Sequence, residues 1–219
     1  MPQIFHPSTN PFSRVSIFGA LFFLAGIAGI LTLFFRSSYV SRVNVVVAQP
    51  VDFSHQAHVS GRGIDCRYCH TSVEESGFAG IPSTQTCMTC HSQIFADSPA
   101  LAMVRESFQN GEYIPWIRVH DLPDFAYFDH QIHVAKGVGC ETCHGRVDQM
   151  PLIRKTETFY MEFCLECHRN PERYIRPREE VYTMGYVPPQ DQQTLGLRLV
   201  EEYDIAPGSV LDDCYICHR

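Results

Sequence analysis

The longest apolar stretch of the chain lies near its start. Residues 15–35 contain no charged side chain, and Arg14 and Arg36 bracket them. As a helix this stretch is about 31 Å long, which spans the roughly 30 Å of a bilayer's hydrocarbon core. A cleaved signal peptide is the alternative, but its apolar region is usually only about 7–15 residues long and a small-residue cleavage site follows it. The pattern therefore predicts a transmembrane anchor over residues 15–35.

Beyond residue 36 the chain shows short segments broken by proline and glycine. One helix is predicted between Ser98 as N-cap, with Pro99 at its first position, and Gly111 just past its end. A second helix is predicted over residues 192–203. Residues 115–125 contain Pro115 and Pro123 and are expected to form a loop.

The net charge of the chain limits the classes of macromolecule that it is expected to bind. The chain has a net charge of −7, and all but Arg14 of its charged residues lie beyond residue 35, where 16 basic residues face 24 acidic ones. An acidic chain of this kind excludes nucleic acid as the expected partner. It suits a basic docking partner, although a mildly acidic surface is also simply a solvated one.

The ten cysteines carry the clearest chemical signal. They form five C-x-x-C pairs, and a histidine follows each pair directly. This spacing is the attachment signature of c-type haem, in which two thiols bond the porphyrin and the histidine ligates its iron. The predicted attachment residues are Cys66, Cys69, Cys87, Cys90, Cys140, Cys143, Cys164, Cys167, Cys214 and Cys217, and the proximal ligands are His70, His91, His144, His168 and His218.

A zinc ribbon is the alternative for the first two pairs, since 17 residues separate Cys69 from Cys87. Zinc, however, does not require a histidine after each pair. Histidine makes up 11 of the 219 residues, so five such histidines arise by chance with a probability on the order of 10⁻⁷. The sequence therefore predicts five covalently bound haems c.

Five further histidines are available as distal iron ligands once His6, before the apolar segment, is set aside: His55, His58, His120, His130 and His133. They match the five proximal histidines in number. Two pairs are spaced three residues apart, which places both imidazoles on one side of a helical turn. By analogy between the two pairs, His55 is expected opposite His70 and His130 opposite His144. His58, His133 and His120 then remain for His91, His168 and His218, in an order that the sequence leaves open.

Methionine is the rival distal ligand, and it raises the reduction potential of a haem. Met88, Met103, Met150, Met161 and Met184 are available, although a methionine is more often core filler. We expect two histidines at four or more irons, with Met150 or Met184 as the first candidate for an exception. Six-coordinate irons have no open position for a substrate, so no catalytic residue is predicted and electron transfer is favoured.

An internal repeat organises the chain. Residues 53–73, FSHQAHVSGRGIDCRYCHTSV, align with residues 128–147, FDHQIHVAKGVGCETCHGRV. The predicted organisation is an N-terminus (1–14), the anchor (15–35), a linker (36–52), two two-haem modules (53–115 and 116–175) and a C-terminal segment with the fifth haem (176–219). About 37 residues per haem leave the porphyrins as the main apolar core. The expected fold is a multihaem cytochrome c, mostly irregular, with short α-helices around the haems.

The FxHxxH element before CxxCH resembles the small class III multihaem cytochromes. Longer strings, among them GIDCRYCHTSVEESGFAGIPSTQTCMTCHSQI and PWIRVHDLPDFAYFDHQIHVAKGVGCETCHGRVDQMPL, resemble the pentahaem subunit of alternative complex III, a bacterial quinol:electron-acceptor oxidoreductase. The resemblance implies multi-span quinol-binding subunits, a peripheral iron–sulfur and molybdopterin-type subunit, a monohaem cytochrome c, and electrons passing to a cytochrome, copper protein or oxidase.

Haem attachment implies that residues 36–219 lie on the outer, periplasmic face of the cell membrane and residues 1–14 in the cytoplasm. Three other functions compete with the electron-transfer subunit. A self-contained quinol dehydrogenase needs an unusual haem ligand and a quinol pocket, a multihaem reductase needs an open haem, and a periplasmic electron store needs free diffusion. The matched histidine counts disfavour the dehydrogenase. The five unaltered motifs disfavour the reductase, and the anchor disfavours the electron store.

Overall fold

The computed structural model describes residues 4–218. Contacts along the chain divide it into two compact units, residues 1–42 and residues 43–219. Each unit is described by itself.

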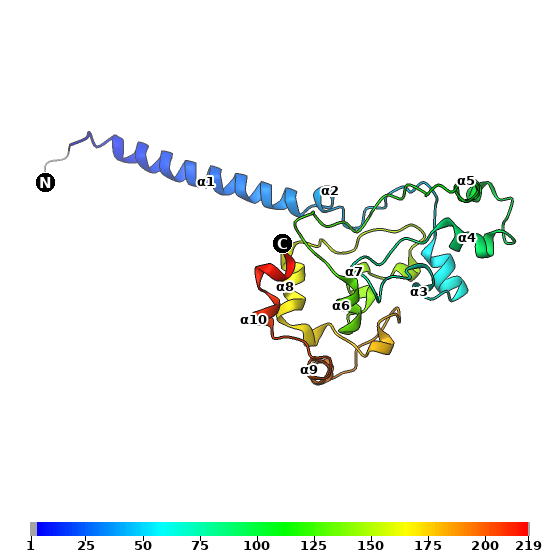
Figure 1. The fold of residues 1–219 in the computed structure, drawn as a ribbon. Coiled ribbons are helices and arrows are strands. Elements are labelled where there is room, and N and C mark those ends of the chain that lie inside the picture. Colours follow the sequence, from blue (N-terminus) through cyan, green and yellow to red (C-terminus); the bar gives the residue numbers. More distant parts are fainter. Residues whose placement is uncertain (1–3, 219) are drawn as a thin grey trace. The chain divides into compact units, whose positions relative to one another are not determined.

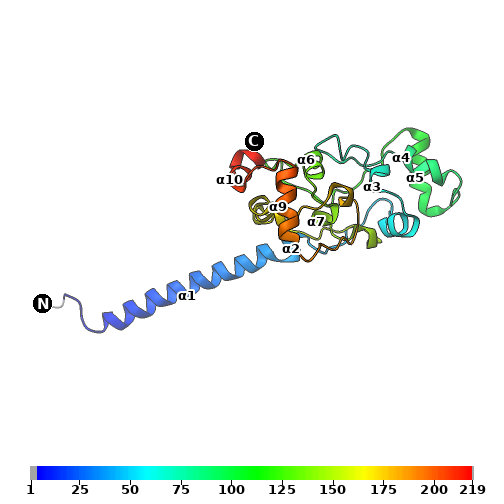
Figure 2. The ribbon, with the colours of Figure 1, turned by 90° about the horizontal axis from the view of Figure 1, so that it is seen from below.

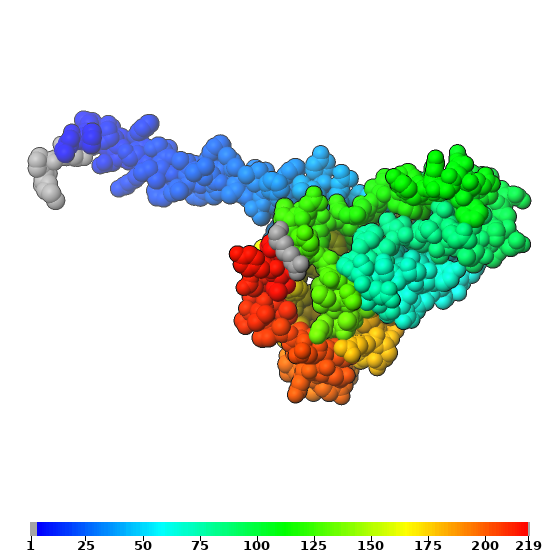
Figure 3. Space-filling view, in the orientation of Figure 1, coloured from blue at the N-terminus to red at the C-terminus, as the bar shows by residue number. Residues whose placement is uncertain are grey.

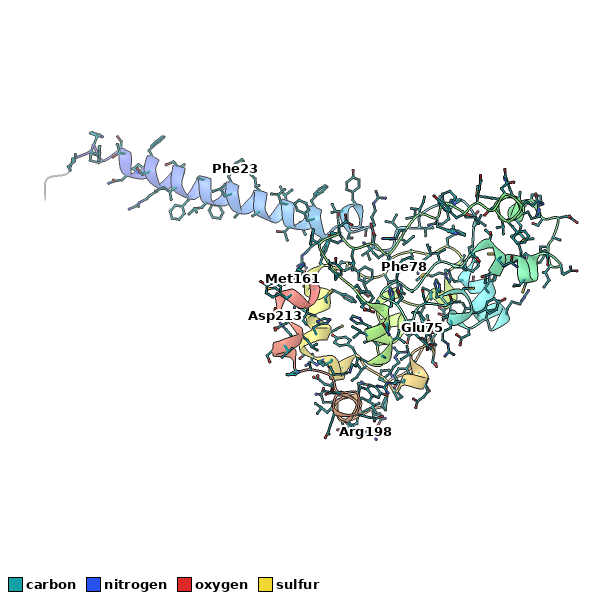
Figure 4. All side chains as sticks on the ribbon, in the orientation of Figure 1. Phe23, Glu75, Phe78, Met161, Arg198 and Asp213 are labelled. Carbon is teal, nitrogen blue, oxygen red and sulfur yellow. The ribbon has the colours of Figure 1, made fainter. Side chains whose placement is uncertain are left out.

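The first unit is dominated by one long helix, α1 (Thr9–Arg36), followed by the short helix α2 (Ser38–Ser41). The predicted segment 15–35 lies within α1, which begins earlier, at Thr9. None of its side chains is buried, and Phe23 projects outward from the ribbon (Figures 3 and 4). By length and composition α1 can cross a membrane, which fits an anchor and also a signal sequence.

The second unit is built from short helices joined by irregular segments (Figure 1). Within residues 4–218 there is no strand, and three isolated bridges, such as the one between Val46 and Arg154, are the only β-type pairings. This arrangement confirms the predicted fold class. The α-helices are α3 (Cys66–Cys69), α4 (Thr84–His91), α5 (Ala102–Asn110), α6 (His130–Ala135), α7 (Cys140–His144), α8 (Met161–Arg169), α9 (Gln192–Glu202), α10 (Gly208–Leu211) and α11 (Cys214–Cys217).

Single turns of other helix types complete the second unit. One is a π-helical turn, η1 (Gln56–Ser60), which follows His55. The others are 3₁₀ turns: η2 (Pro99–Leu101), η3 (Val147–Gln149), η4 (Pro171–Arg173) and η5 (Arg178–Glu180).

Both helices predicted from capping signals are present. Residues 99–110 form η2 and α5, and Gly111 ends the segment with a left-handed φ of 70°, a conformation that glycine adopts without strain. Helix α9 begins after Asp191, whose side chain accepts a hydrogen bond of 3.1 Å from the Thr194 N–H. The segment at residues 115–125 is irregular, as expected.

Few apolar side chains are buried in the described chain, and the main cluster lies around α9. It contains Ile175, Leu199 and Tyr203, with Val138 and Leu195 packed against it. Helix α9 approaches η4 closely because residue 196 is glycine: a Cβ there would lie 1.8 Å from the backbone oxygen of Glu172. So small a side-chain core is what the sequence predicted for a chain that wraps around porphyrins.

We expect Gly196→Ala to lower the free energy of unfolding by about 1–3 kcal/mol, because the added methyl group must push α9 away from the Glu172 backbone. Thermal or denaturant unfolding of the full-length protein in detergent measures the change. Gly61→Ala is the matched control, since its Cβ would meet its nearest neighbour at an ordinary 3.5 Å. Equal stability of the two variants would contradict the close packing of α9.

Candidate haem-attachment sites

Each C-x-x-C pair lies on a short helix of its own: α3, α4, α7, α8 or α11. A spacing of three residues puts both cysteines of a pair on one side of that helix. Two of these helices are started by an aspartate directly before the first cysteine. Asp65 accepts a hydrogen bond of 2.8 Å from Arg67 N–H, and Asp213 accepts one of 3.0 Å from Tyr215 N–H. All ten cysteines are free thiols, as attachment requires.

Four of the five proximal histidines are oriented by the backbone. Their Nδ1 atoms lie within hydrogen-bond distance of a carbonyl oxygen, in the pairs His70–Gly80 (2.7 Å), His91–Ile94 (2.9 Å), His168–Leu211 (2.8 Å) and His218–Phe125 (3.0 Å). An Nδ1–H that donates to a carbonyl leaves the lone pair on Nε2. This is the tautomer that a metal-binding histidine uses.

Three of the predicted distal histidines have the same hydrogen bond between Nδ1 and a backbone carbonyl. Nδ1 lies 2.8 Å from Ser54 O in His58, 2.9 Å from Gly77 O in His130, and 2.6 Å from Asp129 O in His133. Their Nε2 atoms are thereby prepared to ligate iron.

The internal repeat is reproduced in three dimensions around a phenylalanine. Phe53 stacks on His58 at 4.4 Å and meets His55 edge-on at 4.9 Å. Phe128 stacks on His133 at 4.3 Å and meets His130 edge-on at 4.8 Å. The sequence showed these phenylalanines at matching positions, but their role as the packing surface of each histidine pair emerges only from the structure.

Imidazole rings face one another at a separation that suits an iron between them. Two imidazoles bound to opposite sides of one iron, each at about 2 Å, have ring centroids about 6 Å apart. The rings of His58 and His91 are 6.1 Å apart, those of His130 and His144 are 6.3 Å apart, and those of His133 and His168 are 6.1 Å apart. These residues therefore fit haem iron with two axial histidines.

His55 and His120 are the two remaining predicted distal ligands. Burial and, to a smaller extent, the nearby imidazole of His70 together lower the pKa of His55 to about 4. His55 Nδ1 is buried without a hydrogen-bond partner, as is His120 Nε2. Burial also lowers the pKa of His120 to about 4. Both imidazoles are therefore neutral at pH 7, and a buried unpartnered nitrogen is what a metal ligand leaves in a protein without its metal.

His120 lies beside the proximal histidine of the third cysteine pair. Its ring is 4.3 Å from the ring of His144 and 5.8 Å from that of Phe159. The ring in contact with His218 is Phe125, at 5.9 Å. Met150, which with Met184 was a candidate for the exception, is buried, and its carbonyl accepts a hydrogen bond from Gln56 N–H, beside His55.

A buried ion pair supports α7 from outside the haem motif. The Arg176 guanidinium lies 3.0 Å from the Glu141 carboxylate, which also accepts hydrogen bonds from the N–H groups of Gly185 (2.6 Å) and Tyr186 (3.0 Å). Glu141 stands between Cys140 and Cys143. The pair thus fixes the helix that carries both thiols, a role that no sequence pattern had indicated.

Comparison with known proteins agrees with this geometry. Residues 37–110 match the class III cytochrome c family, and residues 126–219 match cytochrome c7 and related cytochromes c. The chain is 38% identical over 184 residues to the protein named menaquinone reductase, multiheme cytochrome c subunit, from Nitratidesulfovibrio vulgaris (strain Hildenborough), covering 78% of this chain and 77% of that one. This chain belongs to the multihaem cytochromes c. Like other members of these families, the cytochrome binds haem c covalently and serves electron transport.

We expect His130→Ala to leave haem attached to the cytochrome through Cys140 and Cys143 but to make one iron high-spin, since the imidazole facing His144 is removed. Absorption and electron paramagnetic resonance (EPR) spectra of the purified protein measure the spin state. His6→Ala is the control, because His6 is exposed, its Nδ1 lies beside Ser8, and it belongs to the first unit, which contains no cysteine. A wholly low-spin spectrum from His130→Ala would contradict the assignment.

Proposed function

We propose that this cytochrome is the electron-transfer subunit of a membrane quinol:electron-acceptor oxidoreductase of the alternative complex III type, and that it binds five haems c. The supporting observation is the set of facing imidazole pairs. They lie beside C-x-x-C helices in both halves of the chain, so the sites are built for several haems in one compact unit.

The five haems would be held by the five C-x-x-C pairs, each with its following histidine as proximal ligand. We assign the distal positions opposite His70, His91, His144 and His168 to His55, His58, His130 and His133, respectively. His120, with its buried unpartnered Nε2, is the fifth candidate ligand. Haem iron held in this way would supply one-electron chemistry, and at the four assigned sites the two histidines would leave no open position for a substrate.

Membership of a larger complex rests on two observations. The N. vulgaris relative is named as one subunit of a menaquinone reductase, which gives a precedent for a quinone-linked assembly. The long strings shared with the pentahaem subunit of alternative complex III point to the same class of partner. The proposed partners are multi-span quinol-binding subunits, an iron–sulfur and molybdopterin-type peripheral subunit, and a monohaem cytochrome c. Electrons would leave toward a periplasmic cytochrome, copper protein or oxidase.

The proposed location follows from α1. Its exposed apolar surface would be satisfied by lipid, with residues 1–14 in the cytoplasm and the haem-binding unit on the periplasmic face. The proposed modules are residues 53–115, 116–175 and 176–219. The first two each contain one cluster of a phenylalanine and two histidines, here called a Phe-His-His cluster: Phe53, His55 and His58, and Phe128, His130 and His133.

Haem stoichiometry is the first quantity to measure. We expect the mass of the intact protein to exceed that of its polypeptide by five haems. A variant with Cys214→Ala and Cys217→Ala should carry four, because no other cysteine pair can take the place of the last one. Five haems in this variant, or four in the unaltered protein, would contradict the proposed count.

Purification from native membranes in mild detergent tests the assembly. We expect the cytochrome to co-purify with multi-span subunits and a large iron–sulfur partner, and the assembly to oxidise quinol. Removal of α1 is expected to release the haem-binding unit from the membrane with its haems in place. Quinol oxidation by the isolated chain would instead identify a self-contained quinol dehydrogenase and overturn the proposal.

A further inference from the structure

The geometry points to a single file of the five attachment sites, in an order that departs from their order in the sequence. We number them along the chain as site 1 (residues 66–70), site 2 (87–91), site 3 (140–144), site 4 (164–168) and site 5 (214–218). Their order in space is 2–1–3–4–5. This inference rests on the proposal of five haems, and it adds which sites are neighbours and which two sites form the ends.

Sites 2 and 1 are joined in two ways. The Tyr68 hydroxyl, between the cysteines of site 1, lies 2.8 Å from the Thr89 hydroxyl, between the cysteines of site 2. The chain at η1 also serves both sites, since His58 faces His91 of site 2 while its carbonyl accepts a hydrogen bond of 3.2 Å from Ile64 N–H, just before site 1. Site 2 is therefore directly beside site 1.

Site 1 is then joined to site 3, although site 2 follows it in the sequence. His130, which faces His144 of site 3, is held by the carbonyl of Gly77 in the loop that follows site 1. A hydrogen bond of 2.9 Å from the Tyr182 hydroxyl to Glu74 adds a further tie between the segments behind the two sites.

Sites 3 and 4 share one short helix. His130 and His133 both lie on α6, and they face His144 of site 3 and His168 of site 4.

Sites 4 and 5 complete the file. His168 Nδ1 lies 2.8 Å from the carbonyl of Leu211, and Arg169 forms an ion pair of 3.1 Å with Asp212, just before site 5. Helix α8 lies beside α10, and the labels of Met161 on α8 and Asp213 before α11 mark the two segments (Figures 1 and 4). Site 5 is also tied to the segment before α6, because Tyr127 N–H donates to Cys217 O at 2.7 Å.

Two views of the second unit agree with this order. Helix α4 lies toward one end, α3 and α7 follow, and α10 lies at the other end (Figures 1 and 2). Sites 2 and 5 therefore have one neighbouring site each along the file, whereas sites 1, 3 and 4 have two. The Coulomb interaction between two irons weakens with distance, so a change of charge at one site acts most strongly on its direct neighbours.

Replacement of single distal histidines by methionine tests the order. A methionine ligand raises the potential of its own haem, which is then reduced first, and the added electron lowers the midpoint potentials of neighbouring haems. The measurement is a redox titration of the full-length protein, followed haem by haem by NMR and EPR. His58→Met is expected to lower the midpoint at site 1 alone. His130→Met is expected to lower those at sites 1 and 4.

Order along the sequence would give a different result, because site 2 would then neighbour sites 1 and 3. An equal shift at sites 1 and 3 in His58→Met would overturn the inference. So would a shift at site 2 as large as that at site 1 in His130→Met. If His58→Met does not fold, His130→Met alone still distinguishes the two orders, since sequence order places sites 2 and 4 beside site 3.

His6→Met is the control and should shift no midpoint, because His6 lies outside the second unit. The haem count from intact mass is measured separately on the same samples. A wrong count would therefore contradict the proposed function, whereas a correct count with the wrong neighbours would contradict only the order.

Discussion

The hydrogen bond between an imidazole Nδ1 and a backbone carbonyl is the interaction on which the arrangement of this cytochrome depends. It occurs at seven of the ten proposed iron ligands, and an Nδ1–H that donates in this way leaves the lone pair of each imidazole on Nε2, where it could ligate iron. Several of these bonds join distant parts of the chain, such as His168 with Leu211 and His130 with Gly77. Ligand orientation and tertiary structure are therefore set by the same contacts.

These contacts matter for stability because the core of buried apolar side chains is small. The main cluster of buried side chains lies around α9, and the helices that carry the cysteines are only four to nine residues long. Helices this short are not stable by themselves. They are held by caps such as Asp65 and Asp213, by the buried pair of Glu141 with Arg176, and, in the holoprotein, by covalent haem.

The two Phe-His-His clusters explain how one local motif serves two neighbouring sites. In each cluster the phenylalanine stacks on the second histidine and meets the first edge-on, so the two imidazoles point in different directions. In the second cluster His130 faces His144 while His133 faces His168. Each cluster therefore brings two sites together, which is the geometric basis of a continuous file.

The sequence by itself determined the positions of the C-x-x-C-H motifs, the apolar helix, the fold class and the two capped helices. These features depend on local spacing: C-x-x-C-H occupies one helical turn and the next residue, and caps act within a few residues. Only the tertiary structure decided that His120 lies beside His144, that Arg176 supports α7, and that the Gly77 carbonyl holds His130. Each of these contacts joins residues far apart in the chain, and no local pattern encodes which distant segments will pack together.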